Sequence, residues 1–321
     1  MKLDVKYMPR KLSEILGQDT TRLESMVKSG NIPHLIFQGP SGTGKTTAAW
    51  ALLREYLGDE MKMFNPPYVF VNASDERGIE TIRELSKRMR TRMGSGETLK
   101  FIVLDEADGL TDPAMMVIKA LVDDPYFKKK VRFIFLLNDK NHLIQPIYSR
   151  CATFNFNRLS SDILIQIARN IVKNEGIVIA DSLLSKVCEY CDGDARFLIN
   201  TYLEHFRTLD KVEAKDVSRV VKVADIAKAV AKTIFIGDTH LDRIKNTMAV
   251  YSKAREEYSI DISPFLEHLS RELNQPWAIG PIAEVDHRMR LGCSESIQML
   301  YLFNELTKRG INGKTNPQGS G

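Results

Sequence analysis

Hydrophobic residues between residue 31 and about residue 156 form short apolar runs separated by segments with helical spacing. The runs cover residues 34–38, 68–71, 101–104, 131–137 and 153–156. Runs of this kind are typical of buried central strands, and helices between them allow the strands to lie parallel. The pattern therefore predicts an α/β fold in which helices flank a parallel sheet.

The spacing of apolar residues becomes helical beyond the last run. Isoleucines recur every fourth residue over 163–171, Ser160 can cap the start of this helix, and Gly176 can end it. Two more helices are predicted at about 181–190 and 194–206. These segments predict a small helical domain after the α/β domain.

From about residue 226 the pattern stays helical, and Pro264, Pro276 and Pro281 are expected to interrupt it. A segment rich in Gly, Asn, Pro and Ser ends the sequence. We therefore expect an α/β domain at 1–158, a first helical domain at 159–225, a second at 226–309 and a disordered tail at 310–321.

The composition, with 43% hydrophobic and 27% charged residues, is that of a globular protein. No stretch approaches the roughly 18 apolar residues that cross a bilayer, and residues 1–10 lack the pattern of a targeting signal. Four scattered cysteines agree with a reducing compartment. The sequence thus predicts a cytoplasmic protein without a membrane partner. A net charge of +4 permits contact with nucleic acid but does not argue for it.

Cys188 and Cys191 have the C-x-x-C spacing of many zinc sites. A zinc site would need a second such pair or nearby histidines, and none follows in the sequence. The two cysteines also lie in an apolar helical pattern, so we predict that they pack in a core.

The strongest motif follows the first apolar run, where residues 39–46 match G-x-x-x-x-G-K-[ST] at every fixed position. A predicted strand leads in and a predicted helix leads out, so backbone N–H groups converge on an anion. Lys45 can reach the β and γ phosphates of ATP, and the Thr46 hydroxyl can bind Mg²⁺. The predicted ATP contacts are Gly39, Pro40, Ser41, Gly42, Thr43, Gly44, Lys45, Thr46 and Thr47. A chance glycine-rich turn is the alternative, and the strand-loop-helix context argues against it.

Two acids, Asp105 and Glu106, end the apolar run 101–104. Asp105 can hold Mg²⁺ through a water molecule, and Glu106 can polarise a water for attack on the γ phosphate. Acids after a strand usually belong to a solvated loop. Since these follow a phosphate-binding motif, we predict a catalytic role.

Three further polar residues are candidates for the ATP site. Asn138 ends the run 131–137 and can contact the γ phosphate or the attacking water, although a turn-forming Asn is the alternative. Arg150 is the kind of planar cation that stabilises a transferring phosphate, although a surface ion pair would also explain it. Arg196, at the start of a helix of the first helical domain, can reach back to the nucleotide.

Several strings together resemble the clamp-loader ATPases, and among them the small subunit of archaeal and eukaryotic replication factor C. They are Lys6-Tyr7-Met8-Pro9, Ile15-Leu16-Gly17-Gln18, Asn31-Ile32-Pro33-His34-Leu35, the phosphate-binding motif, Asn72-Ala73-Ser74-Asp75-Glu76-Arg77-Gly78-Ile79, Leu104-Asp105-Glu106-Ala107-Asp108, Ser149-Arg150-Cys151, Gly193-Asp194-Ala195-Arg196, and Glu284-Val285-Asp286-His287-Arg288 with Ile297-Gln298. The resemblance spans nearly the whole chain. The Ser-Arg-Cys and Asn-Ala-Ser-Asp-Glu-Arg-Gly strings are more specific than the phosphate-binding motif, which many unrelated ATPases share.

The resemblance implies an AAA+ ATPase domain, a helical lid and a helical collar through which five subunits assemble. Its implied cofactors are ATP and Mg²⁺, and its implied partners are other small and large replication factor C subunits, a sliding clamp of the PCNA type and primer-template DNA. Asn138 then corresponds to the first sensor, Arg196 to the second, and Arg150 to an arginine finger that acts in trans. Leu16 corresponds to part of the adenine pocket.

The sequence departs from the family pattern at several positions. Met8 stands where the family usually has Arg, and Asp4 where it has an apolar residue. Met115 stands at a common Gln, and Lys119 and Ala120 stand at paired arginines. The departures at Met8 and Asp4 concern the adenine-side contacts. Those at Met115, Lys119 and Ala120 predict a specialised second small subunit with a fixed place in a mixed ring.

A helix predicted over 79–93 places Arg83, Lys87 and Arg90 on one face, away from its apolar residues. The resemblance implies that this face and Arg77 contact DNA phosphates without regard to sequence. A solvated basic face is the alternative. Two other functions also remain as rivals: a DNA helicase related to branch-migration motors, and a structural subunit that does not hydrolyse ATP.

Overall fold

The computed structural model describes residues 1–74, 78–91, 98–138, 143–258, 262–273, 275–291 and 293–314. The chain divides into two compact units, Met1–Asp210 and Lys211–Gly321. Each unit is described by itself.

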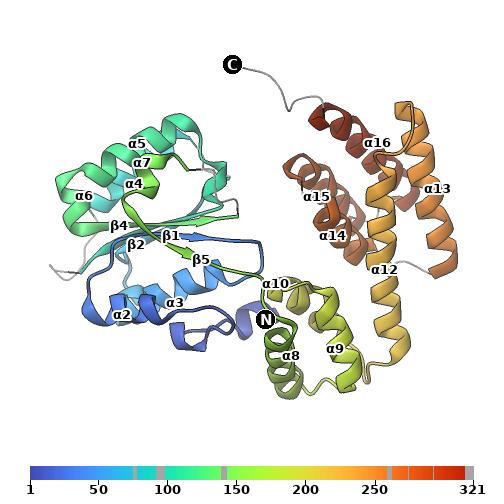
Figure 1. The fold of residues 1–321 in the computed structure, drawn as a ribbon, viewed down its shortest axis with the longest axis horizontal. Helices are drawn as coiled ribbons and strands as arrows, with labels where there is room; N and C mark the ends of the chain where they lie inside the picture. The colour runs from blue at the N-terminus through green and yellow to red at the C-terminus, as the bar shows by residue number, and fades with distance from the viewer. Residues whose placement is uncertain are drawn as a thin grey trace. The chain divides into compact units, whose positions relative to one another are not determined.

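The first unit contains a five-stranded parallel sheet with the order β2-β3-β4-β1-β5 (Figure 1). The strands are β1 (His34–Gln38), β2 (Tyr68–Asn72), β3 (Lys100–Asp105), β4 (Val131–Leu137) and β5 (Cys151–Asn155). Each coincides with an apolar run within two residues at either end, which confirms the predicted sheet. The strands are parallel, so all their carboxyl ends meet at one edge.

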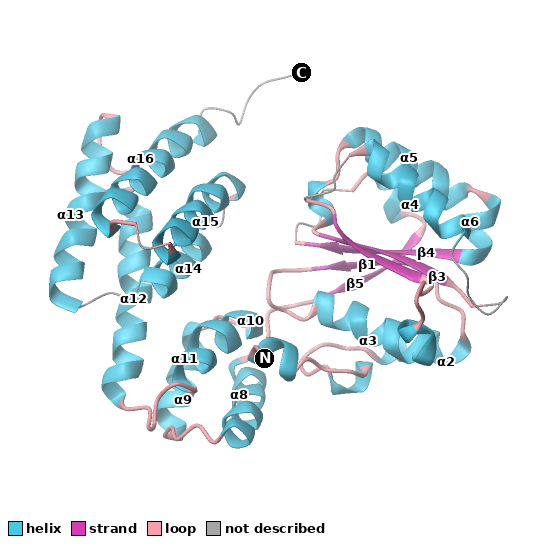
Figure 2. Ribbon diagram, turned by 180° about the vertical axis from the view of Figure 1, so that it is seen from behind, coloured by secondary structure: helices cyan, strands magenta, loops and turns pink. Residues whose placement is uncertain are grey.

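Helices cover both faces of the sheet (Figure 2). One face carries α4 (Ile79–Thr91), α5 (Asp112–Asp123), α6 (Pro125–Lys130) and α7 (Gln145–Tyr148), and the other carries α2 (Thr21–Ser29) and α3 (Lys45–Leu57). Alternate residues of β4 enter the two cores, Phe133 and Phe135 on the side of α4 and α5, and Ile134 and Leu136 on the side of α3. The α/β fold class predicted from the apolar runs is confirmed.

The first helical domain, which corresponds to the lid in the family resemblance, begins in the same unit with α8 (Ser161–Glu175). The Ser160 hydroxyl accepts a hydrogen bond from the Ile163 N–H at 3.4 Å, and Gly176 ends the helix in the left-handed region, both as predicted. The lid continues with α9 (Asp181–Tyr190), α10 (Ala195–Phe197), the π-helical segment η4 (Leu198–Leu203) and α11 (Glu204–Phe206). Cys188 and Cys191 are both buried in it, which confirms core packing. Among the described residues, no group of three or more His, Cys, Asp or Glu side chains could hold a metal ion.

The N-terminal segment contributes α1 (Leu3–Lys6) and the short helical turn η1 (Leu12–Glu14). Leu3 is fully buried, and Leu12 and Ile15 belong to the core beside α3. A second helical turn, η2 (Gly58–Lys62), follows α3, and a third, η3 (Ala107–Gly109), follows the acids after β3.

In the second unit, every described element is a helix. These are α12 (Ala214–Thr233), α13 (His240–Tyr258), α14 (Ile262–Leu273), α15 (Pro276–Arg290) and α16 (Glu295–Lys314). The boundary expected between residues 225 and 226 falls inside α12, and α16 extends into the segment expected to be disordered from residue 310. Residues 315–321 lie outside the described part of the chain. No described helix has the length and apolar character needed to cross a membrane.

The prediction that prolines interrupt the helices of this unit is wrong at two of three positions. Pro276 begins α15, but Pro264 lies in the first turn of α14, where a helix tolerates proline. Pro281 lies inside α15 and cannot donate to the Trp277 carbonyl. That carbonyl instead accepts a hydrogen bond from Arg309 Nη1 at 3.4 Å, and α15 continues past the proline to Arg290.

Candidate nucleotide-binding site

The phosphate-binding loop lies at the edge of the sheet where the strands end, between β1 and α3. Lys45 is only 7% exposed, and its Nζ donates to the carbonyls of Gly39 at 2.7 Å and Pro40 at 2.8 Å. It also donates to Asn138 Oδ1 at 3.0 Å. Asn138 follows β4, next to β1 in the sheet, so the structure brings together two predicted site residues that are 93 positions apart.

Burial lowers the pKa of Lys45 to about 8, because a charged ammonium loses hydration there. The carboxylates of Asp105, Asp108 and Asp194 oppose this shift, and the positive charge of Arg196 adds to it. Arg196 is therefore close enough to interact electrostatically with Lys45. A bound phosphate would stabilise both cations.

The Thr46 hydroxyl and the Asp105 carboxylate form the predicted metal pair. Thr46 Oγ1 donates to Asp105 Oδ2 at 3.2 Å, and Asp105 ends β3 beside the phosphate loop. Hydroxyl, carboxylate and phosphate oxygens with water are the ligands that Mg²⁺ uses in nucleotide sites. The residues present therefore fit Mg²⁺.

Glu106 directly follows the metal pair in a left-handed conformation with φ of 51°. This conformation is uncommon for residues other than glycine, and such backbone often occurs at functional sites. The side chain is exposed, and the residue lies at the edge of the sheet that carries the phosphate loop. The predicted catalytic acid thus lies near the cluster of Lys45, Thr46 and Asp105.

Asp108 is a site residue that sequence reasoning did not assign. Both of its carboxylate oxygens accept from the Asn138 N–H, each at 3.1 Å. This contact holds Asn138 while the side-chain oxygen of Asn138 accepts from Lys45. The signal was present in the acidic motif, but the motif alone does not reveal a partner thirty residues away.

The lid contacts the phosphate loop directly. The Ala195 N–H donates to the Gly42 carbonyl at 3.1 Å, and Asp194 Oδ1 caps α10 by accepting from the Phe197 N–H at 2.9 Å. Gly42 has φ of 71°, and a Cβ there would lie 1.7 Å from Asp194 Oδ1. Only glycine fits both the backbone and the space. Arg196 is the next residue, and its exposed side chain is close enough to the loop to interact electrostatically with Lys45.

Arg150 lies at the opposite edge of the sheet. In the parallel pair of β1 and β5, His34 is beside Cys151, so Arg150 precedes the edge where the strands begin. Lys45 comes after the edge where β1 ends, and β1 is five residues long. At ~3.3 Å per residue the two edges are roughly 16 Å apart. The structure therefore does not bring Arg150 to the phosphate loop of its own chain.

Residues 35–159 match the ATPase family associated with various cellular activities (AAA). The chain is 34% identical to replication factor C small subunit 1 of Pyrobaculum arsenaticum, over 98% of this chain and 97% of that protein. It is 36% identical to the replication factor C small subunit of Aeropyrum pernix, over 94% of each. The chain belongs to the replication factor C small-subunit family.

Solved structures with a similar fold include the RuvB Holliday junction branch migration motor of Thermotoga maritima. The TM-score is 0.57 at 16% identity, over 81% of this chain and 90% of that one. This likeness shows the AAA+ fold only. The small-subunit relatives match at about twice that identity over nearly the whole chain, so the branch-migration alternative is not favoured.

Three of the five departures from the family pattern lie on α5. Met115 is buried in the core between α5 and the sheet, which suits an apolar side chain in place of Gln. Lys119 is half-buried and lowers the pKa of Asp123 through its charge, after the larger effect of Arg150. Ala120 is exposed. A specialised place for this family member in a mixed ring stays a prediction.

The adenine contact predicted at Leu16 has a buried neighbour. Leu16 is half-buried, whereas Ile15 is 8% exposed and lies 4.0 Å from the position of a Cβ built on Gly44. Sequence reasoning did not assign Ile15 to the site. Both residues lie in the family string that also contains Gln18.

The predicted DNA face of α4 separates into two parts. Ile82, Leu85 and Met89 are buried, as predicted for the apolar face. Arg83 and Lys87 are exposed, and Arg83 approaches Glu80 at 3.5 Å. The third cation, Arg90, is bound to Asp124 at 2.9 Å and lies over the rings of Tyr126 and Phe127.

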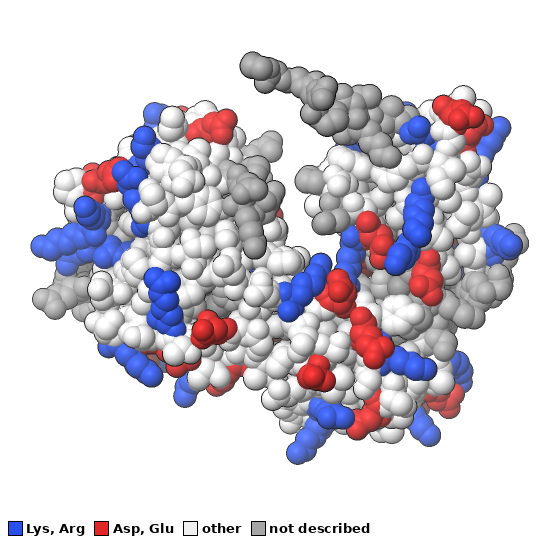
Figure 3. Space-filling model, viewed as in Figure 1, with Lys and Arg blue, Asp and Glu red and all other residues white. Residues whose placement is uncertain are grey.

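Arg77, the fourth predicted DNA contact, lies outside the described residues. On the face shown in Figure 3, basic side chains gather most densely on the side of the first unit where α6 lies. That helix ends in Lys128, Lys129 and Lys130, which sequence reasoning did not single out.

Proposed function

We propose that this chain works as an ATPase subunit of a clamp loader, using Mg²⁺ and ATP to open a ring-shaped sliding clamp and place it on primer-template DNA. Membership of the replication factor C small-subunit family supports the clamp-loader role. The observation that supports ATP chemistry is the cluster of Lys45, Asn138, Thr46 and Asp105 around the phosphate loop.

Each residue of the cluster has a separate task. Lys45 binds the β and γ phosphates, and Thr46 and Asp105 hold Mg²⁺, which offsets the phosphate charge. Glu106 accepts a proton from the attacking water, and Asn138, held by Asp108, orients that water or the γ phosphate. Arg196 contacts the nucleotide from the lid, so the bound phosphates affect the position of the lid.

The active site is completed by a second subunit. Arg150 lies at the edge of the sheet opposite the phosphate loop, which supports a role at the nucleotide of a neighbour. An arginine brought to the γ phosphate by a neighbour stabilises transition-state charge and typically raises the rate by about 10³ to 10⁵. The isolated chain is therefore expected to bind ATP but to hydrolyse it slowly.

The proposed partners are other small subunits, a large subunit, a sliding clamp and primer-template DNA. Five subunits form the ring, in line with the family resemblance. DNA contacts are made to phosphates by Arg83 and Lys87, with Arg77 and Arg90 as further candidates, and are independent of base sequence.

The test compares Lys45→Ala and Arg150→Ala in the isolated chain and in a loader reconstituted with a large subunit. Lys45→Ala should abolish ATP binding by the isolated chain, whereas Arg150→Ala should leave this binding unchanged. In the loader, both variants should lose clamp- and DNA-stimulated hydrolysis at the sites they complete. Wild-type hydrolysis with both variants would instead indicate a structural subunit.

A further inference from the structure

Gln18 connects the phosphate loop to the start of the lid. Its Nε2 donates to the Thr43 carbonyl at 3.1 Å and to the Asn157 carbonyl at 2.7 Å, and its Oε1 accepts from the Asn157 N–H at 3.2 Å. Asn157 lies between β5 and α8, where the chain passes from the α/β domain to the lid. One half-buried amide thus bonds to both functional parts.

The contact with Thr43 affects the phosphate-binding face of the loop. A peptide group is planar and normally trans, so its C=O and N–H point in opposite directions. The Thr43 carbonyl shares a peptide plane with the Gly44 N–H. By fixing that carbonyl, Gln18 fixes the direction of an N–H group at the start of α3, where the loop binds phosphate.

At Asn157, the Gln18 side-chain amide bonds to both backbone groups, the N–H and the C=O. Gln18 both donates to and accepts from the same residue, which restricts the orientation of the backbone at residue 157. Next to it, Gly17 packs against the lid: a Cβ at Gly17 would lie 2.7 Å from Leu159 Cδ2. A shift of this segment of the lid would therefore move Gln18 or break its bonds.

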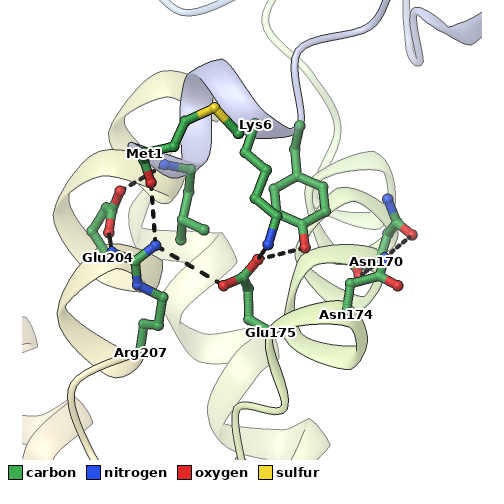
Figure 4. A network of polar contacts seen from close by, with 9 residues as sticks. Met1, Lys6, Asn170, Asn174, Glu175, Glu204 and Arg207 are labelled. Atoms are coloured by element: carbon green, nitrogen blue, oxygen red, sulfur yellow. Dashed lines mark hydrogen bonds and ion pairs between the residues drawn. The ribbon is translucent and has the colours of Figure 1, made fainter.

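The N-terminal segment that carries Gln18 is also attached to the body of the lid (Figure 4). Lys6 and Tyr7 both bond to Glu175 on α8, and the Leu3 N–H donates to Glu204 on α11 at 2.6 Å. Arg207 pairs with Glu204 at 3.1 Å. The N-terminal segment thus contacts the lid through residues 3–7 and the phosphate loop through Gln18.

We propose that Gln18 is a positioning residue that couples phosphate binding at the loop to the hinge, the segment at Asn157 that joins the α/β domain to the lid. The inference rests on the proposed binding of ATP at this loop. Binding of phosphate fixes the Gly44 N–H, the Thr43 carbonyl stays aligned with Gln18, and Gln18 holds Asn157. Loss of the amide weakens ATP binding and also disconnects the hinge from the nucleotide.

The experiment uses the full chain with Gln18→Met, which keeps the size of the side chain but removes all three hydrogen bonds. A fluorescent, non-hydrolysable ATP analogue measures affinity, and hydrogen exchange at Asn157 and its neighbours measures the hinge with and without nucleotide. We expect roughly tenfold weaker binding, since a typical hydrogen bond contributes about that factor. In the wild-type chain, bound nucleotide should slow hydrogen exchange at the hinge, and in Gln18→Met it should not.

Two further variants separate this role from a structural one. Gln18→Glu keeps an acceptor for the Asn157 N–H but replaces both donors by a carboxylate oxygen that repels the Thr43 and Asn157 carbonyls, so it should weaken ATP binding at least as much as Gln18→Met. Gln166→Met changes an exposed glutamine on α8 and should behave as wild type. The inference would be overturned if Gln18→Met kept wild-type affinity for the analogue and wild-type slowing of exchange by nucleotide. This holds whether or not the variant has a lower melting temperature. If the wild-type chain itself binds no analogue, the proposed function fails.

Discussion

Asp123 accepts hydrogen bonds from both Nε and Nη2 of Arg150, at 2.8 and 3.0 Å. Arg150 Nη1 donates to the Pro146 carbonyl at 2.9 Å and to Ser149 Oγ at 3.3 Å. A guanidinium has five N–H donors, so most of them already have acceptors within the chain. An arginine that reaches a neighbour's phosphate must give up some of these bonds or approach with the donor that remains.

The two members of this ion pair should differ strongly in their effect on hydrolysis. We expect Arg150→Ala to lower the hydrolysis rate of the assembled loader by about 10³ or more, since it removes transition-state stabilisation. Asp123→Asn should change the rate by no more than about fivefold in either direction, because exposed ion pairs contribute little. Steady-state ATPase assays measure both. A loss with Asp123→Asn as large as that with Arg150→Ala would show that the arginine depends on the pair.

ATP binding should weaken as the pH rises above 8. In the free chain burial lowers the pKa of Lys45 to about 8, so the protonated form that binds phosphate falls to about a tenth at pH 9. The protonated fraction is about one half at pH 8, so the affinity for ATP should fall about fivefold between pH 8 and pH 9. A pH titration of ATP binding at saturating Mg²⁺ measures this.

The control for this titration is Lys45→Arg. Arginine stays charged throughout this range, so the affinity of the variant, whatever its absolute value, should not change between pH 8 and pH 9. Equal pH dependence in the variant and the wild type would assign the effect to another group.

The contact between the phosphate loop and the lid can be tested with two glycines. Gly42 and Gly30 have φ of 71° and 68°, but a Cβ at Gly30 meets nothing within 4 Å, whereas one at Gly42 meets Asp194. Gly30→Ala should cost about 1 kcal/mol of unfolding free energy for the backbone alone. Gly42→Ala should cost roughly 2 to 4 kcal/mol, because overpacking adds to the same backbone term.

Denaturant unfolding of the two glycine variants gives the comparison. Adding Asp194→Ala to Gly42→Ala should recover part of the loss, because the colliding carboxylate is then gone. If Gly42→Ala lowers the unfolding free energy no more than Gly30→Ala does, Asp194 of the lid does not pack against Gly42 of the loop.

The basic face of α4 predicts a specific change in salt dependence. Truncating Arg83 and Lys87 together should weaken DNA binding uniformly across sequences and reduce the slope of log K against log salt by about 2, roughly 0.9 for each lost phosphate contact. Arg88→Ala is the matched control: it is an exposed cation of the same helix on a different face. Equal effects of Arg88→Ala and of either single truncation would argue for general charge attraction.

The sequence predicts the parts of the site that lie in continuous motifs. Lys45 and Thr46 follow a strand and begin a helix, and Asp105 ends another strand, so their meeting at one sheet edge follows from parallel topology. The burial of alternate residues in β4 follows from the same pattern. Here local spacing and global fold agree.

Other contacts join residues far apart and leave no periodic signal. Gln18 and Asn157 are 139 positions apart, and Arg150, in the turn between α7 and β5, pairs with Asp123 at the end of α5. Pro281 was expected to interrupt a helix because the sequence does not show that Arg309, in another helix, bonds to the Trp277 carbonyl. In each case the missing information is a tertiary partner.

The position of Arg150 has a numerical consequence for an assembly built on the proposed function. Each complete site takes its phosphate loop from one chain and its arginine from the next, a head-to-tail contact. A closed assembly would then have as many complete sites as chains, whereas an open one would have one fewer. The chain at one end would bind nucleotide without an arginine, and the chain at the other end would present Arg150 to solvent. Opening a single junction would therefore inactivate a single site and leave the rest working.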